Sequence, residues 1–300
     1  MDEQEASQDG DGVFAGPVLC PRFVAPLLRA RTGGQSRVRT SLDLGLSEAE
    51  IVVGEDGADL PGGQKLGWEQ IGRIAEARTS KVGEPCFAVD DAGNAEPIRT
   101  YSEATGRQVS LIATATAPTM LIAGFQMHRT TGSDPLSDTR EKIAAVAPIR
   151  GEVLDTTTGL GYTAIEASRT ADHVTTVEID PAAVEMARFN PWSRALFDAR
   201  RITRRVADIE EEIRRFPDGS FSCVLHDPPV LALAGELYSL AFYRQLHRVL
   251  QPGGRLFHYI GNPDSSSGRR TTDGVVRRLH DAGFARVTGA PRAFGVVARR

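Results

Sequence analysis

The sequence predicts an α/β protein whose C-terminal half forms a mostly parallel sheet of seven strands, preceded by a small β-rich domain. From residue 152 onward, short apolar runs alternate with helical segments, as in parallel strands joined by crossover helices. Each of the first four runs ends in an acidic residue. Before residue 125 the texture is instead short apolar runs broken by Gly, Pro and Asp, which is typical of strands and turns.

This change in texture divides the chain into four predicted segments. Residues 1–16 form an acidic tail, poor in large apolar residues, that we expect to be disordered. The tail is followed by a small mixed β-rich domain over 17–125, a linker helix within 126–150 and the α/β domain over 151–300.

The N-terminal half carries few helix signals. Apolar spacing predicts one convincing helix in the β-rich domain, over 67–78. The stretch 90–94, DDAGN, lies between two apolar runs and predicts a hairpin-like turn. In the linker, Ser133-Asp134-Pro135 is typical of a helix start, so we expect a helix over about 136–147 that ends before Pro148.

The α/β domain is expected to be a Rossmann-like sheet covered by helices on both faces. Its strands are expected over 152–155, 173–180, 201–208, 221–227 and 255–261, with two more near 285–289 and 294–299. Its helices are expected over 162–169, 182–190, 235–250 and 272–283, the long third one ending at the Pro-Gly-Gly of 252–254.

Composition indicates a cytoplasmic globular protein. No run of eighteen or more apolar residues exists, and the acidic N-terminus lacks the features of a signal peptide, so we expect no membrane association. The three cysteines are far apart and no His or Cys pair has metal-ligand spacing, so we expect neither disulfides nor a metal. The oligomeric state stays open.

Basic residues are almost all arginines: 35 Lys and Arg include only three lysines, in a chain of net charge −4. Arginines cluster at 200–205, 214–215, 269–270 and 277–278, which invites an RNA-binding interpretation. Aromatic residues do not interleave with them, and solvated surfaces are the alternative interpretation.

In an open parallel sheet the ligand binds outside the carboxyl ends of the strands. The residues that end the first four strands are Asp155, Glu178, Asp208 and Asp227. Four acids at four successive strand ends predict a ligand site rather than four unrelated surface acids.

The turn after the first strand runs from Asp155 to Gly161 and includes Thr156 and Gly159. Glycines let the backbone approach a ligand closely, and the following helix offers free amides. The phosphate-binding pattern GxGxxG is absent, and an acid that begins the loop suits a cationic ligand. S-adenosyl-L-methionine, with its ammonium and sulfonium, fits these features. A generic strand-turn-helix is the alternative.

The next two strand ends fit the nucleoside part of such a ligand. Glu178, with Ile179 beside it, can accept hydrogen bonds from both ribose hydroxyls. Asp208 can accept the exocyclic amine of adenine. The alternatives are a surface acid and a helix N-cap, respectively.

Asp227-Pro228-Pro229 follows the fourth strand and is the sharpest signal. Paired prolines fix the backbone and withhold amide donors, which leaves carbonyls exposed. A carboxylate and a rigid carbonyl can hold the two hydrogens of an amine and aim its lone pair, which is catalysis by positioning.

Other residues are weaker candidates. His128 and Arg129 could reach over the cleft to the substrate, and Tyr238 could face it. His226 and His258 lie in strands of buried type, where hydrogen-bonded core residues are the better interpretation.

These motifs resemble the class I S-adenosylmethionine-dependent methyltransferases over about 150–300. The stretch DTTTGLG resembles their first motif, with Thr157 where the first glycine normally stands. Asp227-Pro-Pro-Val resembles the motif of amino-group methyltransferases, with Val230 in place of the aromatic residue. From about residue 120 on, the chain is similar to an archaeal group of predicted methyltransferases.

A second resemblance leaves an alternative open. The acid-Pro segment followed by LYSLAFYRQLHRVLQPGG is similar to spermidine-synthase-type aminopropyltransferases, which use decarboxylated S-adenosylmethionine and carry a small β domain. The leading hypothesis is methyl transfer to an amine, with RNA favoured as substrate. Aminopropyl transfer is the second hypothesis, and a non-catalytic RNA-binding or partner subunit is the third.

Overall fold

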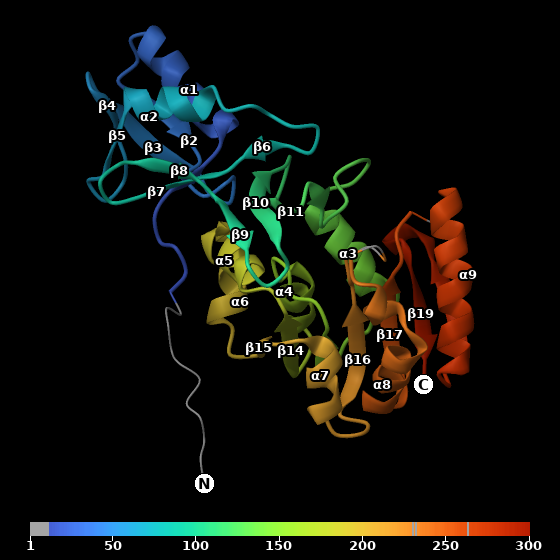
Figure 1. Cartoon of the computed structure of the whole chain (residues 1–300). Helices are drawn as coiled ribbons and strands as arrows, with labels where there is room; N and C mark the ends of the chain where they lie inside the picture. Colours follow the sequence, from blue (N-terminus) through green and yellow to red (C-terminus); the bar gives the residue numbers. More distant parts are fainter. Residues whose placement is uncertain (1–11, 230, 232, 263) are drawn as a thin grey trace.

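The computed structural model describes residues 12–229, 231, 233–262 and 264–300 (Figure 1). Most of the tail predicted over 1–16 therefore lies outside the described residues, as does Val230. No helix in the described ranges is both long and apolar enough to cross a membrane.

The C-terminal half forms the predicted α/β sheet of seven strands. Their order is β15-β14-β13-β16-β17-β19-β18, and β19 alone runs antiparallel to its neighbours. The order reverses at β13, so the carboxyl ends of β13 and β16 flank a switch point. The strands are β13 (Glu152–Asp155), β14 (His173–Glu178), β15 (Ile202–Val206), β16 (Phe221–His226), β17 (Leu250–Tyr259), β18 (Arg286–Ala290) and β19 (Gly295–Arg299).

Alternation along the strands builds two cores. Val153 of β13 packs with one set of helices and Leu154 with the other, because neighbouring side chains leave a strand on opposite faces. The first face is covered by α3 (Pro135–Val146), α4 (Tyr162–Ser168) and α5 (Pro181–Phe189). The second is covered by α8 (Leu240–Val249) and α9 (Ser266–Asp281). The short helices α6 (Arg194–Asp198) and α7 (Ile209–Glu212) follow β14 and β15.

The N-terminal half consists of small antiparallel sheets, which confirms its β-rich character. One sheet joins β1 (Val18–Leu19), β7 (Phe87–Val89) and β8 (Ala95–Pro97), and the turn at 90–94 joins β7 to β8 as predicted. A second joins β2 (Arg37–Thr40), β3 (Ala49–Val53), β4 (Gly57–Asp59) and β5 (Lys65–Gly67). A third joins β6 (Glu84–Pro85), β9 (Arg99–Ser102), β10 (Arg107–Ala113), β11 (Thr119–Ile122) and β12 (Phe125–Gln126).

Some predicted helix positions were wrong. Besides α2 (Trp68–Ala75), the N-terminal half contains α1 (Pro21–Thr32), which the sequence interpretation missed because a proline, Pro26, stands inside it. The single helix predicted over 235–250 is instead a 3-10 turn followed by α8, because the Ser239 hydroxyl accepts the Phe242 amide and starts a new helix. The helix predicted from 272 begins earlier, at Ser266.

The third N-terminal sheet is fastened to the C-terminal domain. Figure 1 shows β9 and β10 beside α5. The Ser102 hydroxyl donates to Asp180 Oδ1 at 2.8 Å, and the same carboxylate caps α5 by accepting the Ala182 amide. The Tyr162 hydroxyl donates to the Pro118 carbonyl at 2.9 Å. These buried bonds hold the sheet over the carboxyl ends of the strands.

We expect Ser102→Ala to destabilise the protein. The change removes a donor from the buried Asp180 carboxylate, and a loss of about 1–3 kcal/mol in the free energy of unfolding is expected. Urea unfolding measures it, with Ser36→Ala, at an exposed serine, as the matched control. Equal stability of the two variants would contradict the proposed fastening.

Candidate active site

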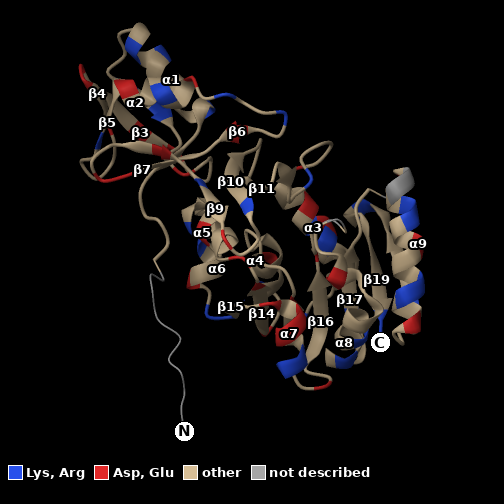
Figure 2. Cartoon of the chain, viewed as in Figure 1, with Lys and Arg blue, Asp and Glu red and all other residues tan. Residues whose placement is uncertain are grey.

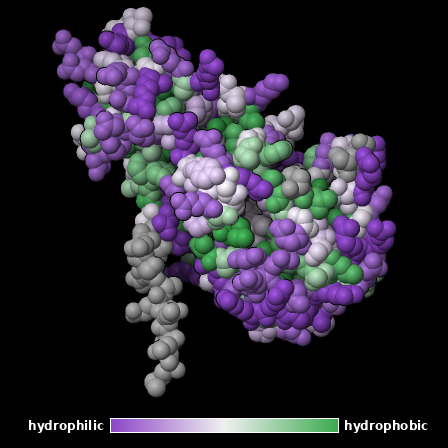
Figure 3. All heavy atoms as spheres, viewed as in Figure 1, coloured by the Kyte–Doolittle hydropathy of each residue, from purple (hydrophilic) through white to green (hydrophobic). Residues whose placement is uncertain are grey.

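A cavity of about 460 Å³ lies at the carboxyl ends of the parallel strands. Its floor comes from the loops after β13, β14, β15 and β16, and part of its roof from β10, β11 and β12. Apolar side chains gather in the middle of the molecule, where the two halves meet, while the outer surface is mostly hydrophilic (Figure 3). The predicted site residues that line the cavity are Thr156, Gly159, Glu178, Ile179, Asp208, Asp227, Pro228, Pro229, His128 and Arg129.

Three predicted site residues do not line the cavity. Asp155 is fully buried behind the loop, where its carboxyl accepts hydrogen bonds from Thr176 and Thr163. Gly161 adopts φ +78°, and a Cβ there would lie 2.6 Å from Leu196, so its role is conformational. Tyr238 is also buried and does not line the cavity. These three residues therefore support the cavity from behind, and their direct contact with a ligand stays a prediction.

The threonines of the first loop explain how it works without its first glycine. Thr157, at that position, donates from its hydroxyl to the backbone carbonyl of Asp227 at 2.8 Å. Thr156 bonds to His226 Nδ1 at 2.7 Å, and Thr158 to Thr176 at 2.6 Å. Thr156 and Thr157 thus fasten the loop to the end of β16, and Thr158 fastens it to β14.

Glu178 holds the same loop from the neighbouring strand. Its Oε2 accepts the Gly159 amide at 2.8 Å and its Oε1 accepts the Asp180 amide at 3.1 Å. Burial raises the pKa of the Glu178 carboxyl. Since an ionised carboxylate offers about four acceptor positions, two remain for ligand hydroxyls.

Asp208 serves two purposes at once. Its Oδ1 accepts the Glu210 amide at 2.8 Å and caps α7, so the capping interpretation is confirmed. It also lines the cavity, next to Ile179, whose side chain is 52% exposed. This corner therefore offers an acceptor beside an apolar surface.

Asp227 belongs to a buried charge network that the sequence interpretation missed. Lys142, only 1% exposed, places its Nζ 2.6 Å from Asp227 Oδ2 and 2.8 Å from Asp138 Oδ2. Arg129 pairs with the other oxygen of Asp138. Burial raises the pKa of the Asp227 carboxyl, and the Lys142 ammonium opposes that rise. Among the described residues, no hydrogen bond reaches Asp227 Oδ1, so this oxygen is available to a ligand.

A hydrogen bond from a buried tyrosine supports the two prolines after Asp227. The Tyr238 hydroxyl donates to the Pro229 carbonyl at 3.0 Å, which is its actual role. His226, which precedes Asp227 in the sequence, is fully buried and forms hydrogen bonds with Thr156 and with the Leu237 carbonyl. Burial lowers the pKa of His226 to about 3. His226 and His258 are hydrogen-bonded core residues, as the sequence predicted.

The remaining side of the cavity holds one buried, neutral histidine and two arginines. Burial lowers the pKa of His128 to about 3, and its Nδ1 bonds to Thr119 at 3.0 Å. Arg129 is neutralised by Asp138 and lies 4.1 Å from the centre of the Phe294 ring. Arg107, on β10, lines the cavity without an ion pair to a described residue. No grouping of acidic, His or Cys side chains in the described part of the chain is placed to hold a metal.

Comparison with known proteins agrees with this geometry. Residues 153–254 match the family model described as a methyltransferase domain. That match covers about a third of the chain and includes the loops after β13, β14, β15 and β16. An uncharacterised protein of Methanocaldococcus jannaschii is 49% identical over 183 residues, which cover 60% of this chain. The chain spans 63% of the length of that archaeal relative.

Two solved structures share the fold across both halves. A spermidine synthase in complex with the transition state analogue AdoDATO is 17% identical, with a TM-score of 0.55, covering 75% of this chain and 78% of that one. The spermidine synthase of Thermotoga maritima is 16% identical, with a TM-score of 0.53, covering 75% and 77%. At these identities the likeness concerns the fold alone.

The buried Asp155 predicts a pH-dependent stability. Burial raises its pKa from 3.8 to about 7 in the folded protein. Between these values the unfolded chain loses the proton and the folded protein keeps it, so stability falls as pH rises and levels off above about 7. In Asp155→Asn this dependence disappears.

Urea unfolding of the two proteins between pH 4 and pH 8 measures the effect. The stability of Asp155→Asn relative to the parent is expected to rise up to pH 7 by about 4 kcal/mol at most. The same change at the exposed Asp198 is the control and leaves a constant difference. A constant difference for Asp155→Asn as well would refute the raised pKa.

Proposed function

We propose that this protein is an S-adenosyl-L-methionine-dependent methyltransferase that methylates an amino group, with RNA as the favoured substrate class. The observation that carries the proposal is Asp227-Pro228-Pro229 at the end of β16, which lines a cavity within the segment that is similar to a methyltransferase domain.

The donor and acceptor set of the cavity fits the cofactor. Its volume of about 460 Å³ lies within the range of small-molecule sites. Glu178 would accept the ribose hydroxyls, Asp208 the adenine amine, and exposed Ile179 would pack on the base. Arg107 is suited to a carboxylate. When bound, the cofactor supplies an activated methyl group on its sulfonium.

The reaction requires the chain to position an amine rather than to activate it strongly. Lys142 fixes Asp227 through Oδ2, which leaves Oδ1 to accept one N–H of the substrate. The Pro228 carbonyl would accept the second, and Tyr238 holds the adjoining Pro229 carbonyl in place. With both hydrogens held, the nitrogen lone pair points along one direction.

The lining also limits which part of an RNA could enter. Five carboxylates line the cavity against two arginines, and Arg129 is already paired. Such a lining suits the exocyclic amine of a base and disfavours phosphate. The backbone phosphates of an RNA substrate would therefore have to find their cations outside this cavity.

Asp227→Ala and Asp227→Asn test the assignment of the amine-holding residue. We expect turnover to fall by roughly 100-fold or more, because the substrate amine loses its orientation, while S-adenosylmethionine binding is kept. Turnover is followed with radiolabelled cofactor on a total RNA fraction, and binding by calorimetry. Asp273→Asn, an exposed change on α9, is the control. Unchanged turnover in Asp227→Ala would end this role.

Aminopropyl transfer is the second candidate, because the acid-rich cavity also suits a cationic polyamine and because the shared fold extends over 75% of the chain. A thermal-shift comparison separates the two. Saturation at about 100 times Kd stabilises a protein by about 2.7 kcal/mol. We expect S-adenosylmethionine to raise Tm more than its decarboxylated form, since Arg107 can pair with the carboxylate. A larger shift with the decarboxylated form would favour aminopropyl transfer.

A further inference from the structure

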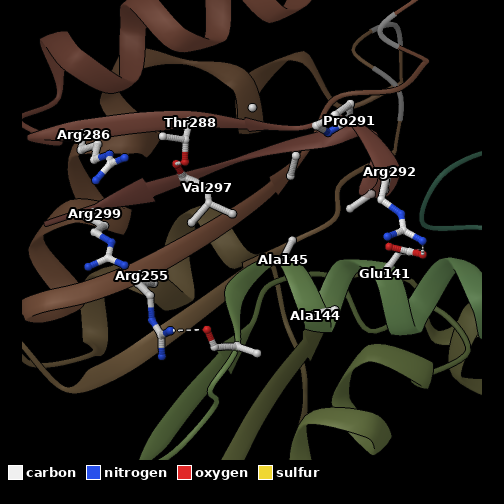
Figure 4. Close-up of a pocket in the computed structure, with 14 residues that line it drawn as sticks. Glu141, Ala144, Ala145, Arg255, Arg286, Thr288, Pro291, Arg292, Val297 and Arg299 are labelled. Atoms are coloured by element: carbon white, nitrogen blue, oxygen red, sulfur yellow. Dashed lines mark hydrogen bonds and ion pairs between the residues drawn. The ribbon is translucent and has the colours of Figure 1, made fainter.

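A second cavity, of about 480 Å³, lies on the face of the sheet that carries α3. Strands β17, β18 and β19 form one wall and α3 the other (Figure 4). We call it the arginine groove, because its lining includes four arginines and a single acidic residue, Glu141. The arginines are Arg255, Arg286, Arg292 and Arg299.

Three of these arginines form a ladder across the sheet. Arg255 of β17 is directly opposite Arg299 of β19, which is directly opposite Arg286 of β18. Figure 4 shows the three side chains one above another on the same face. Neighbouring strands lie roughly 4.8 Å apart, so three guanidinium groups follow one another at short intervals.

The arginines differ in how they are compensated. Arg255 donates to the carbonyls of Ala147 and Pro148, which fixes its direction, and Arg292 pairs with Glu141 at 3.2 Å. Arg286 and Arg299 are exposed, and no carboxylate of the described chain pairs with either. The positive charge of the ladder is therefore not balanced within the described part of the chain.

Fold stability accounts for only part of this ladder, through the hydrogen bonds that Arg255 donates to the segment after α3. Like charges directly opposite each other on adjacent strands destabilise a sheet. Charges on an edge strand prevent edge-to-edge pairing, which could explain Arg286 on β18. That explanation fails for Arg255, which lies on β17, two strands further in. On the opposite face of β19, Val296 and Ala298 are buried beneath α9, so only the α3 face is charged.

We propose that the arginine groove is a phosphate-binding site. Guanidinium groups bind phosphate oxygens through two parallel N–H bonds, and their fixed planar fork suits successive phosphates. Either a free di- or triphosphate or the backbone of a single-stranded nucleic acid carries this chemistry.

The arginine groove and the catalytic cavity are both lined in part by helix α3. Glu141 of α3 lines the groove, while the adjacent Lys142 holds Asp227 of the cavity. At the end of the groove, Arg292 and Ala293 lead directly to Phe294, whose ring lies under Arg129 of the cavity. The Arg292 end of the groove therefore lies close to the catalytic cavity. The phosphate site itself does not depend on the proposed reaction.

The test uses Arg286→Gln, Arg299→Gln and the double variant of the full chain. Arg277→Gln, an exposed change of the same charge on α9, is the matched control. One arm measures binding of a fluorescent twelve-nucleotide oligouridine by anisotropy at several salt concentrations. The other measures binding of pyrophosphate by calorimetry. Cofactor binding and Tm are measured on every variant.

We expect the double variant to lose at least tenfold in affinity at low salt. For the oligouridine, the slope of log K against log salt should fall by about 0.7 for each arginine removed. Tm without ligand should be unchanged or higher, because repulsion across the strands is relieved. Loss of oligouridine binding indicates a nucleic-acid strand as the source of the phosphates, and loss of pyrophosphate binding alone indicates a free phosphate compound.

Two results would overturn the proposal: no binding of either probe by the parent protein, or an equal loss in Arg277→Gln. Both are independent of turnover, so an inactive or differently reacting enzyme leaves the measurement intact. Conversely, failure of phosphate binding leaves the Asp227 experiment unaffected.

Discussion

The contact on which the site depends is the buried ammonium of Lys142 between two aspartates. Breaking a buried ion pair by removing one partner typically costs about 3–5 kcal/mol, because the other charge stays buried. Here one lysine is shared by Asp138, on its own helix, and Asp227, which is 85 positions away along the chain. The contact therefore fixes the linker helix to the loop after β16 and leaves Asp227 with one defined free oxygen.

Short polar contacts also join the other loops that form the floor of the catalytic cavity. In place of a flexible glycine, Thr157 bonds to the backbone of Asp227, so the first loop and the Pro-Pro loop support each other. Glu178 accepts the Gly159 amide and links this pair to β14. A loop built in this way is already ordered before a ligand arrives, which lowers the entropic cost of binding.

Features of the site that depend on residues close together in the sequence could be predicted from it, whereas contacts between distant residues could not. The strand-end acids were predictable because parallel strands place their carboxyl ends together, and three of the four line the cavity. Asp155 lies behind the loop instead, because side-chain direction at the last residue of a strand depends on neighbours such as Thr176 on β14. The pairing of Lys142 with Asp227 could not be predicted, since a single lysine in a helix carries no local signal of its distant partner. The turn at Ser239 was a missed local signal, a Ser before an apolar run.

Charge is separated between the two cavities, although they share one helix. The catalytic cavity is lined by five carboxylates, and the arginine groove by four guanidinium groups. Figure 2 shows acidic residues on α7, beside the catalytic cavity, and basic residues along α9, near the edge of the sheet formed by β18. A polyanion that carries an amino group would meet repulsion if it entered the catalytic cavity with its phosphates, and attraction if only the amine entered. In an acidic chain of net charge −4, this separation would let one molecule hold a phosphate in the proposed phosphate site and present an amine to Asp227 at the same time.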